Sequence, residues 1–277
     1  LRMFTLNCKG RLIKIEEPVV MGILNTTPDS FHAASRTKSV DDAVEKAKQM
    51  LGAGATILDI GAQSTRPGSE NVGADTELER IIPIIEAISK AFPEVIISVD
   101  TFIAKVAKAA VMAGASIVND ISGGLFDENM LTTVAELKTP FICMHVRGNA
   151  NTIHHITPSS NCTLEVLDFF IERIAACNKA GIVDIIVDPG FGFGKSMDEN
   201  FQLLKNLQVF TPLKKPILLG VSRKSMIYKT LNETAENALN GSTVLHTIGL
   251  LNGASILRVH DVKEAREAII LTQQLKQ

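Results

Sequence analysis

The amino-acid sequence predicts an α/β fold, namely a (β/α)8 TIM barrel preceded by an N-terminal β-hairpin. Three observations lead to this prediction: eight short apolar segments rich in β-branched residues, a helical pattern after each of them, and a phrase that recurs along the chain. The 277 residues, of which 45% are hydrophobic, suffice to bury one large core. We therefore expect residues 1–277 to form a single barrel domain.

The N-terminal segment, residues 1–17, alternates apolar and polar side chains around Lys9 and Gly10. This alternation predicts the β-hairpin rather than a signal peptide, because it contains no continuous apolar run. No later segment approaches the roughly 20 apolar residues that a membrane-spanning helix requires.

The recurring phrase is a sequence motif in which the predicted end of a helix is followed by a glycine and then by a predicted strand. It occupies residues 53–58, 113–118 and 252–257, with a weaker copy at 180–183. An apolar helical pattern precedes each glycine, which suits the left-handed residue that ends many helices, and a β-branched run follows. The phrase therefore predicts alternating helices and strands.

The predicted strands are almost entirely apolar, which is typical of parallel strands covered on both faces. They lie near residues 19–25, 56–61, 95–100, 116–120, 140–145, 184–188, 217–221 and 255–260. Eight such units favour a closed barrel, and an open doubly wound sheet is the alternative.

The charge and the cysteines restrict the kinds of partner. A net charge of −2 leaves no basic surface for nucleic acid or an anionic membrane, so an anionic ligand needs a local cluster of cations. Cys8, Cys143, Cys162 and Cys177 show no metal-binding spacing and are predicted to be buried free thiols. We expect a cytoplasmic protein that binds small molecules.

Polar residues gather where the predicted strands end. In a barrel of this kind the carboxyl ends of the strands form the active-site face. They carry Asn25, Asp59, Arg66, Asp100, Asn119, Asp120, Met144, His145, Asp188, Ser222, Arg223, Lys224, Arg258 and His260. Taken singly, some have a structural interpretation: Asp261 suits a helix N-cap, and Asp59 or Asp120 suits the orientation of a loop.

The residue types indicate two kinds of ligand group. Arg258 and His260 lie two apart on a strand and point the same way. With Asn25 and Arg66 they suit a phosphate or diphosphate, because guanidinium and amide donors match anionic oxygens. A second set combines donors and acceptors as a flat heterocycle with N–H groups and a ring carbonyl requires. Its members are Asp100, Asn119, Asp188 and Lys224.

Two motifs resemble other kinds of site. Residues 189–196 resemble a P-loop, but Pro189 replaces a required glycine, and Phe191 and Phe193 crowd a phosphate. Lys224 could form a Schiff base. Against this, residues 222–225 open a helix whose free N–H groups favour an anion.

Seven phrases in this order resemble the dihydropteroate synthase family over essentially the whole chain. They occupy residues 21–31, 64–68, 98–101, 119–121, 188–195, 222–225 and 258–261. The resemblance implies an enzyme that condenses 6-hydroxymethyl-7,8-dihydropterin diphosphate with p-aminobenzoate and releases pyrophosphate by an SN1-like substitution at the pterin methylene. It also implies Mg²⁺, a homodimer and competition by sulfonamides for the p-aminobenzoate site.

The same resemblance assigns roles to residues. It places the pterin ring on Asp100, Asn119, Met144, Asp188 and Lys224. It places the diphosphate on Asn25, Arg66, Arg258 and His260, with Mg²⁺ on Asn25. It places p-aminobenzoate beside Thr65, Arg66, Pro67, Phe193 and Ser222. Asp100, Lys224 and Asn25 are the implied catalytic residues, and we expect Asp100 to favour the developing cation.

The sequence departs from the family pattern at three places. The first loop reads His32-Ala33-Ala34-Ser35 where the family has Ser-Asp-Gly-Gly. Gln63 replaces a glutamate, and Arg147 replaces a glutamine, which is expected to add a cation near the mouth. The altered first loop bears on how that loop closes over the substrates. Neither Gln63 nor Arg147 affects the predicted ring-binding set.

Two alternative functions use the same barrel. One is a methyltetrahydrofolate methyltransferase domain, which has little use for the diphosphate set. The other is a non-catalytic pterin- or folate-binding module, against which the intact Asn25 and Lys224 argue. Release of pyrophosphate distinguishes the synthase from both.

Overall fold

The computed structural model describes residues 3–25, 36–62, 73–149, 152 and 159–275, and the side chains of these ranges except 36–39. It begins with the predicted hairpin: β1 (Phe4–Cys8) pairs antiparallel with β2 (Arg11–Ile15). Lys9 and Gly10 form the turn with φ angles of 54° and 84°, because a two-residue turn that matches the right-handed twist of the strands requires positive φ at both positions.

The barrel contains eight parallel strands. In chain order they are β3 (Val19–Asn25), β4 (Ile57–Gly61), β5 (Ile96–Asp100), β6 (Ile117–Asp120), β7 (Phe141–Met144), β8 (Ile185–Asp188), β9 (Leu218–Leu219) and β10 (Ile256–Val259). Their spatial order is β8-β7-β6-β5-β4-β3-β10-β9, and a parallel bridge from Val187 to Ile217 joins the two ends. The predicted barrel is therefore confirmed.

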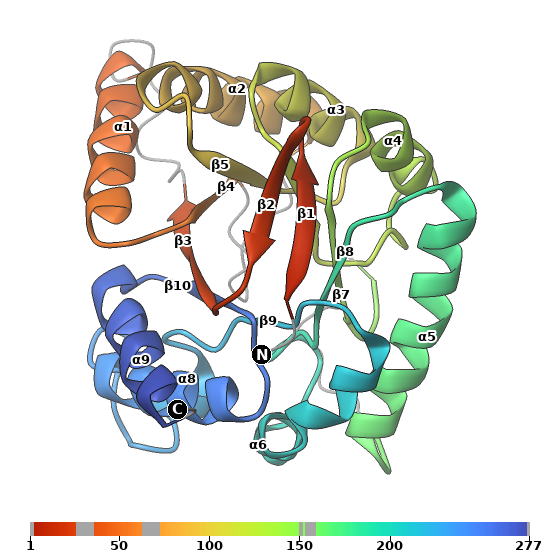
Figure 1. Cartoon of the computed structure of the whole chain (residues 1–277), viewed down its shortest axis with the longest axis vertical. Coiled ribbons are helices and arrows are strands. Elements are labelled where there is room, and N and C mark those ends of the chain that lie inside the picture. The colour runs from red at the N-terminus through yellow and green to blue at the C-terminus, as the bar shows by residue number, and fades with distance from the viewer. Residues whose placement is uncertain (1–2, 26–35, 63–72, 150–151, 153–158, 276–277) are drawn as a thin grey trace.

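Helices surround the strands, as Figure 1 shows. They are α1 (Arg36–Gly52), α2 (Ala74–Ala91), α3 (Ala104–Ala113), α4 (Met130–Leu137), α5 (Cys162–Ala180), α6 (Met197–Lys205), α7 (Ser225–Tyr228), α8 (Leu239–Leu251) and α9 (Val262–Gln274), with a 3-10 helix at Leu207–Leu213. Among the described helices, none is both long and apolar enough to cross a bilayer.

The helix–glycine–strand phrase corresponds to real helix ends. Gly114 and Gly181 follow α3 and α5 with φ angles of 136° and 99°, values that a side chain would strain. One predicted strand is shorter than expected: β9 covers two residues rather than 217–221. The chain leaves the sheet after Leu219 and turns toward Arg223, which has a φ of 54°.

The hairpin closes the amino-terminal end of the barrel. Leu6, Cys8 and Ile15 are buried against a layer of strand residues. That layer consists of Val19, Met21, Ile57, Ile96, Ile117, Ile142, Ile186, Leu218 and Ile256. The Asp184 carboxylate before β8 accepts the Asn7 N–H at 2.7 Å. Figure 1 shows β1 and β2 lying across this end, so ligands must enter from the opposite end.

Candidate active site at the carboxyl ends of the strands

Strand periodicity places polar side chains inside the mouth of the barrel. Residues two apart on a strand face the same side, so the position two residues after each member of the apolar layer also faces inward. At this second level stand Ile23, Asp59, Ser98, Asn119, Met144, Asp188, Gly220 and Arg258. Asn25 and Asp100 follow two residues further on, level with Gly61 across the sheet.

Arg258 lies at the centre of this polar level. Its Nε donates to Asp59 Oδ2 and its Nη2 donates to Asp100 Oδ2, both at 2.6 Å. The amide of Asn119 donates to the same Asp59 oxygen at 3.1 Å. Burial raises the pKa of Asp100, and the positive charge of Arg258 opposes that rise. Three strands are thus joined by one guanidinium.

This pairing changes one expectation. Arg258 was predicted to hold the diphosphate, but the structure places its guanidinium between two carboxylates, one of which, Asp100, belongs to the predicted ring-binding set. The guanidinium therefore contacts the ring-binding set directly, and its predicted role toward the diphosphate stays a prediction. Asp59 was counted among the polar strand-end residues with loop orientation as its structural interpretation, and its Oδ2 instead accepts from Arg258 and Asn119.

Asp188 and Lys224 border the same space beside Gly220. A Cβ added at Gly220 would lie 3.9 Å from Asp188 Oδ2 and 4.0 Å from Lys224 Nζ. Asp188 Oδ1 accepts the Gly190 N–H at 2.8 Å. Burial lowers the pKa of Lys224 to about 8, while the charge of Asp188 acts in the opposite direction. A carboxylate and an ammonium therefore face one ligand position.

The loop after β8 contacts Lys224. The lysine ammonium donates to the carbonyl oxygen of Phe191 and lies 4.7 Å from the centroid of the Phe193 ring. Phe193 packs with Met144, Ile121 and Val146 in a small apolar cluster. A flat ligand would thus meet an apolar wall opposite polar groups.

Ser222 and His260 form a hydrogen-bonded pair at the rim. The Ser222 Oγ accepts the His260 backbone N–H at 3.2 Å and lies 3.1 Å from Nδ1 of the same residue. Burial, followed by the charge of Arg258, lowers the pKa of His260 to about 4, so the ring is neutral at pH 7. When the Ser222 hydroxyl donates to Nδ1, the Nε2–H is left to donate to an anion.

The predicted ring-binding residues are brought together. Asp100, Asn119, Met144 and Asp188 occupy neighbouring strands, and Lys224 lies close enough to Asp188 for their charges to interact. Asn25 ends β3 with an exposed side chain. Thr65, Arg66 and Pro67 lie outside the described residues, as do Gln63 and residues 32–35, so their predicted roles stay predictions.

Arg147 does not add a free cation to the mouth. It is buried, donates two hydrogen bonds of 2.7 Å to the Glu165 carboxylate, and pairs with Glu199 at 2.9 Å. It also donates to the Gly194 carbonyl at 3.1 Å. Two carboxylates thus neutralise the charge that was expected there.

Two aspartates with structural interpretations behave differently from each other. Asp120 accepts hydrogen bonds from the Ser122 N–H and Oγ and from the Gly124 N–H, so its predicted role in a loop is confirmed. Asp261 stands at the N-cap position of α9, but its side chain makes no capping hydrogen bond. Its two oxygens instead accept from Arg223, each at 2.8 Å.

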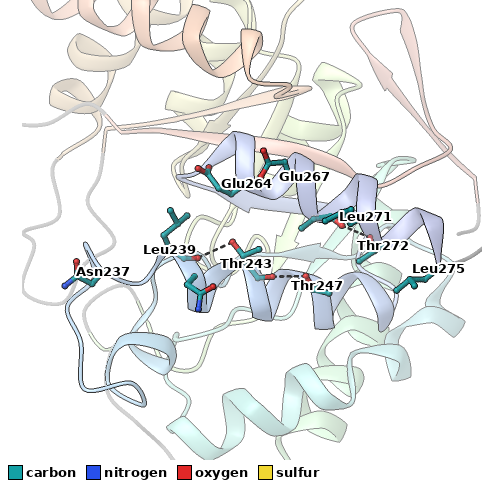
Figure 2. A pocket seen from close by; sticks show the side chains of 11 residues that line it. Asn237, Leu239, Thr243, Thr247, Glu264, Glu267, Leu271, Thr272 and Leu275 are labelled. Carbon is teal, nitrogen blue, oxygen red and sulfur yellow. Dashed lines mark hydrogen bonds between the residues drawn. The ribbon is translucent and has the colours of Figure 1, made fainter.

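A second concavity lies outside the barrel, in the groove between α8 and α9 (Figure 2). Its lining includes Leu239, Thr243, Thr247, Leu271 and Leu275. None of the predicted site residues lines this groove, so it is separate from the mouth.

Comparisons with known proteins identify the family of this chain. Residues 21–260 match the family described as pterin binding enzyme. The dihydropteroate synthase of Escherichia coli K12 is 44% identical over 94% of this chain and 93% of its own length. This chain belongs to the dihydropteroate synthase family. The relatives from Synechocystis and Bacillus subtilis, 43% and 42% identical, carry the same name, and the methyltransferase alternative is not favoured.

Solved structures of dihydropteroate synthases have the same fold. The enzyme of Xanthomonas albilineans with 4-aminobenzoic acid is 38% identical and superposes with a TM-score of 0.91, covering 99% of both chains. The same enzyme in complex with 7,8-dihydropteroate is 36% identical, with a TM-score of 0.88 and 99% coverage of both chains. The dihydropteroate synthase fold therefore extends over nearly the whole chain.

Proposed function

We propose that this chain condenses 6-hydroxymethyl-7,8-dihydropterin diphosphate with p-aminobenzoate to form dihydropteroate and pyrophosphate. One observation carries the proposal: a buried set of carboxylates, an amide and an ammonium lies at the barrel mouth within reach of Arg258. That set suits a pterin ring, and the donors beside it suit the diphosphate that leaves. The 4-aminobenzoic acid and the 7,8-dihydropteroate named with the Xanthomonas albilineans enzyme, a substrate and the product of this reaction, support the same choice.

The ring is held by groups fixed on strands. Asp188 accepts from the amino and ring N–H groups of the pterin, Asn119 both donates and accepts, and Lys224 donates to the ring oxygen or nitrogen. Met144 packs against the ring. Because strand backbones hold most of these side chains, the ring meets an arrangement formed before it binds, which lowers the entropic cost of binding.

The diphosphate lies near Asn25, His260 and the outer side of Arg258, with Arg66 as a further predicted contact. Mg²⁺ fits the donor set at Asn25: this ion binds one or two protein oxygens and takes its other ligands from phosphates and water. The exposed Asn25 amide at the end of β3 supplies such an oxygen. When bound, the ion neutralises charge on the departing pyrophosphate.

The reaction needs no covalent bond to the protein. The C–O bond between the methylene and the diphosphate breaks, and the electron pair leaves with pyrophosphate. The positive charge left on the methylene spreads into the electron-rich dihydropterin, where the carboxylate of Asp100 favours it. The amine of p-aminobenzoate then forms the C–N bond and loses a proton. The chain contributes positioning of both substrates and electrostatic stabilisation.

The second substrate lies on the side of the mouth that Phe193 and Ser222 form. The Phe193 ring offers an aromatic face, and Ser222 precedes the short helix α7, whose backbone N–H groups favour a carboxylate. Thr65, Arg66 and Pro67 complete this position in our proposal. Sulfonamides, which have the shape of p-aminobenzoate, are expected to compete there.

The assembly and the cellular location are part of the same proposal. Six large apolar side chains on α8, on α9 and at the residue after α9 are between 38% and 73% exposed, and such a surface suits contact with a second copy of the chain. They are Val244, Ile248, Leu251, Ile270, Leu271 and Leu275. The four buried, unpaired cysteines suit a reducing compartment, and we assign a cytoplasmic homodimer.

The test is incubation of the purified chain with both substrates and Mg²⁺, with dihydropteroate measured by chromatography and pyrophosphate by a coupled assay. We expect one pyrophosphate for each dihydropteroate. Binding of the pterin without either product would support the non-catalytic module and refute the proposal. A Lys224→Ala variant is the control, because any product that it forms at the full rate does not depend on this site.

A further inference from the structure

The loop between β8 and α6, residues 189–195, has an alternating structure. Gly190, Gly192 and Gly194 all adopt left-handed conformations, with φ angles of 69°, 84° and 67°. Between them, Phe191 is fully buried and Phe193 reaches the barrel mouth. A Cβ at Gly190 would lie 1.9 Å from the carbonyl oxygen of His145, so this loop packs directly on the end of β7.

Two lysines hold the carbonyl groups of this loop. The buried ammonium of Lys195 donates to the carbonyl oxygens of Gly190 at 2.8 Å and Phe193 at 3.2 Å, and it lies 3.4 Å from that of His145. The Phe191 carbonyl points elsewhere and accepts from Lys224. The loop therefore lies between one lysine in the interior and another at the site.

The surroundings of Lys195 are unusual for an ammonium. Its side chain is 3% exposed, and among the described ion pairs none includes it, so backbone carbonyl dipoles provide its solvation. Burial lowers its pKa to about 7. An apolar side chain of similar length would avoid the desolvation cost of a buried charge. The presence of a lysine at this buried position is therefore best explained by its hydrogen bonds to the loop carbonyls.

Neighbouring contacts strengthen the same loop. Arg147 donates to the Gly194 carbonyl, the residue between Phe193 and Lys195. Ser196 caps α6 in a reciprocal capping box with Glu199, and Glu199 also pairs with Arg147. The loop is thus fixed at both ends, and Lys195 is the group that draws its middle toward β7.

We propose that Lys195 is a positioning residue for the synthase reaction: it holds residues 189–195 so that Phe193 forms the p-aminobenzoate face and Phe191 orients the Lys224 ammonium. This inference rests on the proposed function. Lys195 belongs to the segment that resembles a P-loop, and phosphate binding does not explain its presence there. The proposal gives this lysine a role. Lys195 touches neither substrate and acts through the loop.

The position of the affected groups predicts an unequal effect on the two substrates. Asp100 and Asn119 lie on strands that do not contact this loop, and Asp188 is fixed by β8 as well as by its bond to Gly190, so most ring contacts persist without Lys195. Phe193 lies on the loop itself. Loss of the ammonium therefore raises the KM for p-aminobenzoate more than the KM for the pterin diphosphate, and it lowers kcat through Lys224.

The test compares Lys195→Met and Lys195→Gln with the unchanged chain. Methionine keeps the length of the side chain without donors, and glutamine keeps neutral donors. We expect backbone hydrogen exchange in residues 189–195 to accelerate by about tenfold to a hundredfold in the methionine variant, because the hydrogen bonds from the lysine side chain to the loop carbonyls are lost. We expect a smaller increase in the glutamine variant, which also carries the test should the methionine variant fail to fold.

Two control variants separate positioning from general effects. Lys205→Met makes the same change at an exposed site on α6 and is expected to leave the loop and both KM values unchanged. Val134→Ala opens a cavity under α4 and lowers global stability without touching the loop. A rise of at least tenfold in the KM for p-aminobenzoate should appear only in the Lys195 variants.

The outcomes are distinguishable. Unchanged loop exchange in Lys195→Met would overturn the proposal, and so would faster exchange with equal changes in both KM values. Absence of dihydropteroate with the unchanged chain would instead refute the proposed function. In that case the exchange measurement still decides whether Lys195 holds the loop.

Discussion

At the scale of single residues, Asp59 is the least expected member of the site. It is fully buried on β4, yet its Oδ2 accepts from both Arg258 and Asn119. The Asp59 carboxylate accepts from Nε of the guanidinium while Asp100 accepts from Nη2. Asp59 therefore orders the site without facing the ligand.

Substitution of Asp59 tests this role. In Asp59→Asn, the buried Arg258 loses one of its two carboxylate partners, and breaking a buried ion pair costs about 3–5 kcal/mol. We expect denaturant unfolding to report a loss near the lower limit, because Asp100 remains. The KM for the pterin diphosphate should rise by about tenfold. The exposed pair of Lys105 with Asp75 provides the control Asp75→Asn, for which neither quantity should change. An unchanged KM in Asp59→Asn would show that Asp59 is structural only.

The lowered pKa of Lys224 predicts that activity decreases at high pH. Burial lowers its pKa to about 8 from an ordinary value near 10.5, so the ammonium that binds the substrates is lost as pH rises through 8. We therefore expect kcat/KM to fall above about pH 8. Lys224→Arg should be less active and should keep its remaining activity to higher pH, since a guanidinium stays protonated. An alkaline limit that is the same in both proteins would contradict this assignment.

The lowered pKa of His260 predicts that the pH profile of kcat/KM has no second inflection near neutral pH. Because burial lowers its pKa to about 4, it is neutral over the usual assay range and should cause no change in kcat/KM between pH 6 and 7.5. NMR titration of the imidazole in the free protein measures this pKa directly. A titration near 6.5 would contradict the neutral state assigned to His260 and would place an inflection within this pH range.

At the scale of elements, the hairpin and the strand-end loops have separate tasks. β1 and β2 cover the amino-terminal end of the barrel, opposite the site, through Leu6 and Ile15. The loops after β8 and β9 supply Phe193, Ser222 and Lys224 to the mouth. Stability at the closed end should therefore be separable from catalysis at the open end.

Leu6→Ala tests that separation. Removing a fully buried leucine side chain costs about 2–5 kcal/mol through lost burial and the cavity left behind. We expect thermal unfolding at a lower temperature and unchanged KM values for both substrates at 25 °C. A change in either KM would show that the two ends of the barrel are coupled.

At the scale of the whole molecule, the sequence predicted the barrel because its signals are local. Each strand is a short apolar run, and helix-ending glycines such as Gly114 stand directly before strands. The grouping of Asp100, Asn119, Asp188 and Lys224 was also predictable, because parallel strands bring their carboxyl ends to one face. The resemblance to dihydropteroate synthases then gave these residues roles.

Other features depend on contacts that the sequence does not display. The pair of Arg258 with Asp59 joins residues 199 positions apart and follows from the strand register around the closed barrel. Arg147 looked like an added cation because the two carboxylates that neutralise it come from α5 and α6. The partners of Lys195 are backbone carbonyls, which every residue carries. No pattern of side chains could predict them.

The central claim is that one mouth holds the pterin ring and the diphosphate side by side. A crystal structure of this chain with 6-hydroxymethyl-7,8-dihydropterin diphosphate and Mg²⁺ tests it most directly. The account predicts the ring N–H groups on Asp188, the ring beside Met144 and Asn119, and the diphosphate toward Asn25 and His260. A ligand bound in the groove between α8 and α9, or a ring that does not contact Asp188, would contradict it.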